Sequence, residues 1–193
     1  RKFIIVCADS TGHGVPGALM SMLGVTLLNE QFRTFGIRQP GVILGHLRNK
    51  VKEILAQEGS VNDQKDGMDM AIAIIDQDKK ELQFAGADRP LLLFRKNEPL
   101  AGEEDNPYLS LETDHYKLYV IKGDKQPIGV NWEETEFTNH VIKIREHDSL
   151  YLFTDGFVDQ YGGEKRKKYK SRRLKKLLLS VQEEPMENQR KLI

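Results

Sequence analysis

The chain has 193 residues, of which 39% are hydrophobic and 30% are charged, and its formal net charge is zero. This length suits one domain with a real core, and the zero net charge gives no electrostatic reason to expect binding to nucleic acid or to a membrane. The single cysteine, Cys7, excludes a disulfide within the chain and a cysteine-based zinc cluster. No apolar run approaches the ~20 residues of a membrane span and no signal peptide is present, so we expect a cytoplasmic protein.

The first part of the chain predicts a strand followed by two helices. A short apolar run at 3–8 is rich in β-branched residues, which is typical of a buried strand. A helix is expected from about Pro16 to Phe35, and because it is apolar nearly all round it should be well buried. A second helix is expected from Pro40 to a point before Gly59.

The middle of the chain predicts strands joined by turns. Runs with a high β propensity lie at 69–75, 82–85, 91–95, 116–121, 137–144 and 150–153, and a polar loop is expected at 98–114. The remainder is basic and helical, with one apolar face formed by Leu174, Leu177, Leu178 and Val181. Helices first, then antiparallel strands, then helices indicate an α+β fold rather than alternating βαβ units. We therefore predict a single α+β domain over residues 1–193.

Asp9 stands where the first predicted strand ends, beside a glycine-rich loop at 11–17. An acid at a rigid strand end, next to flexible backbone, can present its carboxylate to a ligand; the alternative is that Asp9 caps the following turn or helix. Three glycines of the loop also spell the G-x-G-x-x-G dinucleotide pattern. That interpretation is disfavoured, because Asp9 would face a pyrophosphate with the wrong sign and Pro16 lacks a backbone N–H to bind it.

Asp155 also follows a short apolar strand, and Gly156 follows it. Two strand-end carboxylates, helped by a carbonyl such as that of Ser10, are suitable ligands for Mg²⁺ or Mn²⁺, because hard cations take oxygen ligands. The alternative for Asp155 is a simple turn acid. His13 lies in the glycine-rich loop, where we favour a hydrogen-bonding role over catalysis, and the other histidines are scattered.

A basic run extends from Lys165 to Lys176. Its ordinary interpretation is a solvated loop and an exposed helix face. The functional alternative is a surface that docks an acidic or phosphorylated protein, in which case the chain would be a non-catalytic binding module of a signalling protein.

Four segments of the chain together resemble a known family of enzymes. They are 8–18, 84–90, 123–129 and 152–163. The first contains Asp9-Ser-Thr-Gly-His-Gly14, which resembles the Asp-x-x-Gly-His-Gly motif of bacterial metal-dependent (PPM-type) serine/threonine phosphatases of the stage II sporulation protein E (SpoIIE) subgroup. The other three resemble later blocks of that family in the right order.

The resemblance implies a fold and a reaction. The fold is a sandwich of two antiparallel β-sheets flanked by helices. The reaction is hydrolysis of phosphoserine or phosphothreonine by water that Mn²⁺ or Mg²⁺ activates. The implied substrates are small phosphorylated regulators of the anti-sigma antagonist kind, and the catalytic domain is often joined to a sensor or receiver domain. No nucleic acid or membrane partner is implied.

Carried over by position, the resemblance also assigns roles to residues. Asp9 matches the bridging metal ligand and Asp155 the later metal aspartate, so both are the expected catalytic residues. Ser10 matches the position that lends a carbonyl to the metal. His13 and Gly14 match the loop beside the metals and are the expected substrate-binding residues. Asp88 stands where the pattern leads us to expect Asn.

The resemblance also predicts two blocks that the chain does not contain. A Gly-Asp block would precede Arg1 and an Asp-Asp block would follow Ile193. We therefore expect a fragment in which two carboxylates replace about four, so the two metal ions should bind weakly or not at all and activity should be low. Sheet edges left open by the missing segments would allow self-association.

Overall fold

A computed structural model describes residues 1–57, 66–98, 106–162 and 166–193. The chain divides into two compact units, of which the first comprises Arg1–Leu91 and Lys122–Ile144 and the second comprises Leu92–Ile121 and Arg145–Ile193. Each unit has its own sheet, helices and hydrophobic cluster. The prediction of a single domain therefore stays a prediction. Parts of three predictions lie outside the described residues. They are residue 58 at the end of the predicted second helix, residues 99–105 of the predicted loop, and Lys165 at the start of the basic run.

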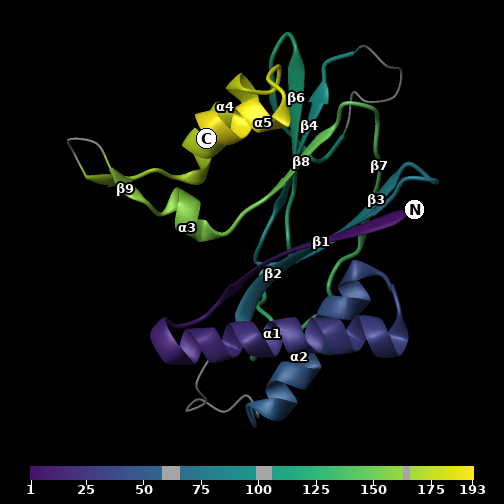
Figure 1. Ribbon diagram of the computed structural model, residues 1–193, viewed down its shortest axis with the longest axis vertical. Coiled ribbons are helices and arrows are strands. Elements are labelled where there is room, and N and C mark those ends of the chain that lie inside the picture. Colours follow the sequence, from purple (N-terminus) through teal and green to yellow (C-terminus); the bar gives the residue numbers. More distant parts are fainter. Residues whose placement is uncertain (58–65, 99–105, 163–165) are drawn as a thin grey trace. The chain divides into compact units, whose positions relative to one another are not determined.

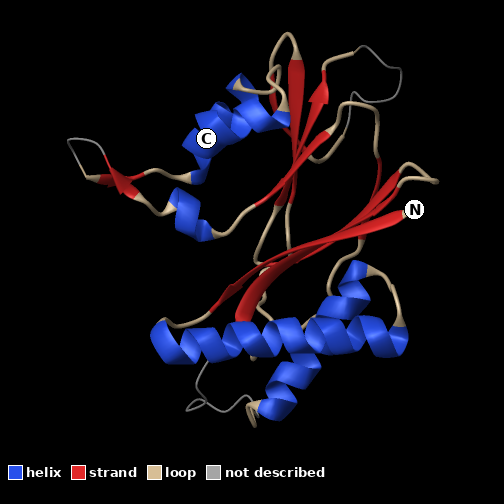
Figure 2. Ribbon diagram, viewed as in Figure 1, coloured by secondary structure: helices blue, strands red, loops and turns tan. Residues whose placement is uncertain are grey.

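The first unit contains a four-stranded antiparallel sheet with the order β1-β2-β3-β7. Figure 2 draws the strands in red. Its strands are β1 (Lys2–Ser10), β2 (Met68–Asp76), β3 (Glu81–Ala87) and β7 (His140–Lys143). β1 pairs with β2 over its whole length, from Lys2 opposite Asp76 to Ser10 opposite Met68. The predicted strands are confirmed, and this register decides which side chains share a face of the sheet.

Two helices, α1 (Gly14–Phe35) and α2 (Pro40–Ile54), pack against this sheet (Figure 1). Pro40 occupies the first turn of α2, where its missing N–H costs no hydrogen bond. One buried cluster joins the helices to β2 and β3, and it includes Met20, Leu27, Ile43, Leu44, Leu47, Val51, Met70, Ile72 and Ala85. This is the helix-on-sheet layer that the segregated sequence pattern predicts.

Burial differs from the prediction at β1 and α1. The expectation of a buried strand at 3–8 is wrong, because β1 is an edge strand in which Phe3 and Ile5 are 37% and 45% exposed. The expectation of a well-buried first helix is also wrong. α1 buries one face and leaves apolar side chains on the other exposed, namely Val15, Leu19, Met22 and Val25. Hydrophobic content alone does not reveal the order of strands in a sheet or how many faces of a helix have a neighbour.

The second unit contains a four-stranded sheet with the order β5-β6-β4-β8. Its strands are β4 (Leu91–Lys96), β5 (Leu109–Glu112), β6 (Tyr116–Ile121) and β8 (Ser149–Leu152). The helices of this unit are α3 (Asp155–Val158), α4 (Ser171–Ser180) and α5 (Met186–Leu192). The cluster that joins α4 to the sheet contains Leu92, Phe94, Leu118, Leu174 and Leu178, which confirms the predicted apolar face of α4.

Three short strands of the second unit were not predicted. β5 lies in the segment expected to be a polar loop, and β9 (Tyr161–Gly162) pairs with β10 (Lys167–Lys168) where a helix was expected. β5 is only four residues long and β9 and β10 only two, so each is too short for its pattern to stand out in the sequence. The helices and antiparallel pairings nevertheless confirm the α+β class. Among the described residues, no helix has both the length and the apolar character needed to cross a membrane.

Candidate active site

Asp9 and Ser10 are the last two residues of β1, as the sequence predicts. The register places Asp9 directly opposite Asp69 and Ser10 opposite Met68 on β2. Opposite residues of an antiparallel pair point to the same face of the sheet, so two carboxylates lie side by side at this end of the strands. Like charges in this arrangement repel one another, and a cation is needed to stabilise it.

Arg89 supplies that cation. Its Nη2 lies 3.1 Å from Oδ2 of Asp9 and 2.9 Å from Oδ2 of Asp69. The arginine side chain is only 11% exposed, whereas the two carboxylates are 33% and 30% exposed and so remain open to solvent. The neighbouring Cys7 thiol responds to both charges: burial raises its pKa, Arg89 opposes that effect, and Asp9 adds to it.

The backbone around Arg89 is held by close contacts between two of the segments that resemble the phosphatase family. Asp88 N donates to the carbonyl of Asp124 and Asp124 N donates to the carbonyl of Gly86, both at 2.8 Å. A Cβ atom added at Gly86 or Gly123 would lie 2.1 or 2.6 Å from the carbonyl oxygen of Arg89. Glycine is therefore required at both positions where these two backbone segments meet.

Asp88 adopts a backbone conformation that few residue types tolerate. Its φ is +56°, in the left-handed region that Asp and Asn tolerate better than most residues. The departure from the expected Asn therefore keeps the turn intact. The side chain of Asp88 is paired with the exposed Lys125 at 3.7 Å.

The loop after Asp9 is fastened to the start of β2. Thr11 N donates to the carbonyl of Gly67 at 3.0 Å, and Gly67 N donates to Oγ1 of Thr11 at 3.0 Å. His13 is exposed and occupies the N-cap position of α1 without a side-chain capping bond, and Gly14 begins the helix with φ +62°. The structure thus brings Asp9, Ser10, His13 and Gly14 together on one strand end and the helix that follows it.

Asp155 belongs to the second unit. It is exposed, it follows β8 and Thr154, and it begins the four-residue helix α3, whose C-cap Asp159 donates its N–H to the Asp155 carbonyl at 2.8 Å. A strand end followed by a turn-like element confirms the local prediction. The pairing of Asp155 with Asp9 stays a prediction.

Asp69 and Arg89 are the two residues of this site that sequence reasoning missed. Asp69 begins a predicted strand and does not end one, so only the β1–β2 register connects it with Asp9. Arg89 lies in the β3–β4 connection. No local sequence pattern singles it out, because the neighbouring Asp88 is charged as well.

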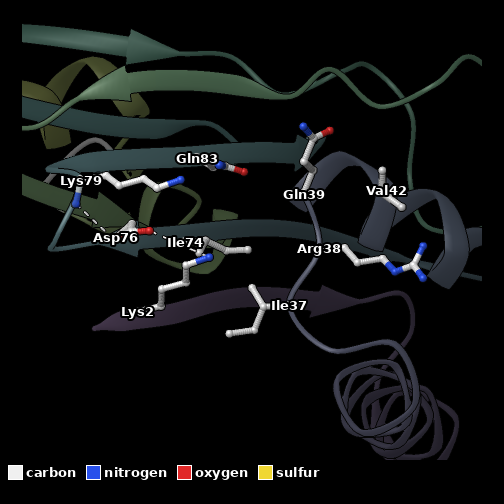
Figure 3. Close-up of a pocket in the computed structure, with 9 residues that line it drawn as sticks. All are labelled: Lys2, Ile37, Arg38, Gln39, Val42, Ile74, Asp76, Lys79 and Gln83. Atoms are coloured by element: carbon white, nitrogen blue, oxygen red, sulfur yellow. Dashed lines mark hydrogen bonds and ion pairs between the residues drawn. The ribbon is translucent and has the colours of Figure 1, made fainter.

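A cavity of about 430 Å³ opens at the other end of the β1–β2 pair from Asp9 (Figure 3). Its lining combines basic, polar and apolar side chains, namely Lys2, Ile37, Arg38, Gln39, Val42, Ile74, Asp76, Lys79 and Gln83. Lys2 and Asp76 form a loose ion pair at 3.9 Å. None of the predicted site residues lines this cavity.

The basic run of the second unit forms β10 and the start of α4. A smaller cavity of about 210 Å³ is lined by Gln160, Tyr161, Gly162, Lys167, Tyr169 and Arg173. Lys168 pairs with Asp159 at 2.7 Å, and both side chains are largely exposed. The described part of the basic run is thus a solvated surface, as its composition predicts, with aromatic side chains beside it.

A sequence profile of the stage II sporulation protein E (SpoIIE) family matches residues 1–193. The chain belongs to the SpoIIE family. This confirms the predicted resemblance over the whole chain. No curated protein sequence matches it significantly.

Solved structures similar to this SpoIIE-family chain include phosphatase domains. The SiaA-PP2C domain of Pseudomonas aeruginosa is 27% identical with a TM-score of 0.73, and the match covers 97% of this chain and 69% of that one. The RsbU and RsbW domains of a Mycobacterium tuberculosis protein are 19% identical with a TM-score of 0.67 over 97% and 45% of the two chains. The PP2C domain of SpoIIE from Bacillus subtilis, solved with a fragment of its regulatory domain, is 16% identical with a TM-score of 0.61 over 100% and 50%.

These comparisons confirm the predicted fold and the predicted enzyme class, that of protein phosphatases. The SpoIIE-family chain spans about half the length of the second and third of these structures. Activity, substrate and partners of the whole protein are therefore matters for proposal.

The donor atoms at Asp9 suit the metal that such a phosphatase needs. Carboxylate and carbonyl oxygens are the hard ligands that Mg²⁺ and Mn²⁺ prefer, and Asp9, Asp69 and the Ser10 backbone offer them at one strand end. Among the residues that the structure describes, no group of three or more His, Cys, Asp or Glu side chains forms a ready metal cluster. Asp9 and Asp69 are thus a fitting but partial set of ligands.

Proposed function

We propose that this chain is the catalytic part of a metal-dependent protein phosphatase that hydrolyses phosphoserine or phosphothreonine on a small regulatory protein. The observation that carries the proposal is the carboxylate pair at the end of β1 and β2, within a chain that matches the SpoIIE family from end to end. Its carboxylates are partly exposed, as ligands of a solvent-accessible ion must be.

The proposal assigns roles to the residues that the sequence singled out. Asp9, the Ser10 carbonyl and Asp155 would hold Mn²⁺ or Mg²⁺, two ions in the complete site. When bound, such ions lower the pKa of water and offset the charge of a transferring phosphoryl group. RsbX, a relative in fold with a TM-score of 0.54, was solved in complex with magnesium.

His13 and Gly14 would contact the substrate. They stand at the N-terminus of α1, where unpaired backbone N–H groups and the helix dipole favour a negatively charged ligand. The first turn of α1 carries no acidic side chain to oppose a phosphate. The phosphorylated side chain would therefore approach the metal ligands across the start of this helix.

The proposed partner is a small phosphorylated regulator of the anti-sigma antagonist kind. Two relatives in fold support a place in bacterial signalling, since one was solved as RsbU and RsbW domains and another belongs to a study of the stressosome. The basic surface of β10 and α4 would dock such a partner by charge. We also propose a sensor or receiver domain in the same protein, a cytoplasmic location, and self-association through the exposed edge of β1.

Phosphatase activity tests the proposal directly. The full-length protein should release phosphate from a phosphoserine protein in the presence of Mn²⁺, and Asp155→Asn should abolish this release. Asp114→Asn, in an exposed turn of the same unit, is the matched control and should leave the rate unchanged. An unchanged rate in Asp155→Asn would end the assignment.

Metal binding separates this function from the alternative of a non-catalytic docking module. Calorimetric titration of the full-length protein with Mn²⁺ should show binding that Asp9→Asn removes. A protein that binds a phosphorylated partner but no Mn²⁺ would favour the docking module.

A further inference from the structure

One guanidinium nitrogen of Arg89 contacts both Asp9 and Asp69. The Nη2 atom lies 3.1 Å from Oδ2 of Asp9 and 2.9 Å from Oδ2 of Asp69, so this nitrogen lies between the two carboxylates. Guanidinium stays charged at every pH at which the protein is folded, so this bridge does not titrate away. The cluster of two carboxylates and one guanidinium has a net charge of −1.

The fold fixes Arg89 independently of these ion pairs. Its carbonyl is enclosed between Gly86 and Gly123, and the hydrogen bonds between Asp88, Asp124 and Gly86 hold the two loops together. With its backbone held in this way and its side chain only 11% exposed, Arg89 keeps its guanidinium near Asp9 even when another cation arrives. The segments 84–90 and 123–129, in which no metal ligand was predicted, thus hold Arg89 in its place.

We propose that Arg89 is a built-in counter-cation that competes with a divalent ion for Asp9 and so limits the affinity of the site. The inference rests on the proposed metal site at Asp9. A divalent ion drawn to this carboxylate meets a fixed positive charge already in contact with one of its oxygens. The repulsion between the two cations weakens metal binding, while the same bridge keeps the opposed carboxylates stable when no metal is bound.

If Arg89 had only a structural role, its loss would change the metal affinity in the opposite direction. If Arg89 only orients Asp9 for the metal, its loss would leave the carboxylate disordered and the metal would bind more weakly. If Arg89 competes, its loss raises the net negative charge of the cluster and the metal binds more tightly. The two roles therefore differ in the sign of the change.

The test is a calorimetric titration of the metal-free, full-length protein with Mn²⁺. Arg89→Gln should bind Mn²⁺ at least about tenfold more tightly than the wild type. Its melting temperature without metal should fall, and the rise in melting temperature on adding Mn²⁺ should exceed that of the wild type. Arg89→Lys, which keeps the charge, should stay near the wild-type affinity.

Lys125→Gln is the matched control. It removes a cation from the same corner of the fold, but Lys125 is 89% exposed and pairs with Asp88 instead of Asp9. Its Mn²⁺ affinity should equal that of the wild type. A folded Arg89→Gln protein that binds Mn²⁺ no more tightly than the wild type overturns the inference.

A second comparison covers the case in which Arg89→Gln does not fold. Asp69→Asn removes the like charge opposite Asp9, so Arg89 can then be replaced without leaving two unneutralised carboxylates. The double variant Asp69→Asn/Arg89→Gln should bind Mn²⁺ more tightly than Asp69→Asn alone, and equal affinities overturn the inference.

The variant Asp9→Asn separates this inference from the proposed metal site. If Asp9→Asn abolishes Mn²⁺ binding while loss of Arg89 does not tighten it, only the inference about Arg89 fails. If Asp9→Asn changes nothing, the metal assignment fails and the inference with it.

Discussion

Two buried arginines, one in each unit, pair with aspartates in different ways. Nη2 of Arg89 contacts both Asp9 and Asp69, and both carboxylates are about a third exposed. Arg95 forms a two-point pair with Asp148, in which Nε and Nη2 lie 2.9 and 2.7 Å from the two carboxylate oxygens. Asp148 is only 4% exposed, and it also accepts a hydrogen bond from the backbone N–H of Arg145.

The difference separates a structural pair from a functional cluster. At Arg95 one cation meets one anion, and only 8% and 4% of the two side chains are exposed, so a ligand has little access to Asp148. At Arg89 one cation faces two anions, and solvent reaches the anions. Accessible negative charge is what a binding site for metal ions requires, whereas a closed pair contributes only to the fold.

The largest expected effect is the loss of stability in Asp148→Ala. Removing one partner of a buried pair leaves Arg95 charged and desolvated, so unfolding should become easier by about 3–5 kcal/mol. Urea denaturation of the wild type and the variant measures this difference. A cost below about 1 kcal/mol would show that the pair at Arg95 is not the structural one.

Gly86→Ala should come next. Its Cβ would lie 2.1 Å from the carbonyl oxygen of Arg89, which is backbone and cannot turn aside, so we expect a loss of about 3 kcal/mol. Gly45→Ala is the control, because a Cβ there meets nothing within 4 Å and alanine favours the helix by up to about 1 kcal/mol. Equal stabilities of the two variants in thermal unfolding would contradict the close packing around Arg89.

Asp69→Asn should have a smaller effect on stability. The carboxylate is 30% exposed and its removal relieves repulsion with Asp9, so we expect a change of about 1 kcal/mol or less. The contrast with Asp148→Ala in the same denaturation experiment is the direct measure of the difference between the two arginines. A loss as large as that of Asp148→Ala would make the Arg89 cluster a structural pair as well.

The sequence predicted the parts of the site whose positions depend on residues close by in the chain. Asp9 at the end of an apolar strand, the glycine-rich loop and the helix after it are local features, and all were predicted. Asp69 and Arg89 became visible only through the register of β1 with β2 and the contact between two loops, which are far apart along the chain. The exposed face of α1 was missed for the same reason, because burial depends on which element lies opposite.

The smallest expected effect concerns His140, on the strand that follows the loop containing Asp124. Burial lowers its pKa below the ordinary value of 6.5, while Asp124 and a backbone hydrogen bond oppose that change. Between the lowered folded-state pKa and 6.5, the unfolded chain binds more protons, so stability should fall as the pH drops through this range. Replacing His140 with glutamine should reduce this pH dependence, and urea midpoints measured from pH 7.5 to pH 5 would show it. His115→Gln, in an exposed turn, is the control. If His140→Gln loses as much stability on acidification as the wild type, other groups carry the pH dependence and burial of His140 has no measurable part in it.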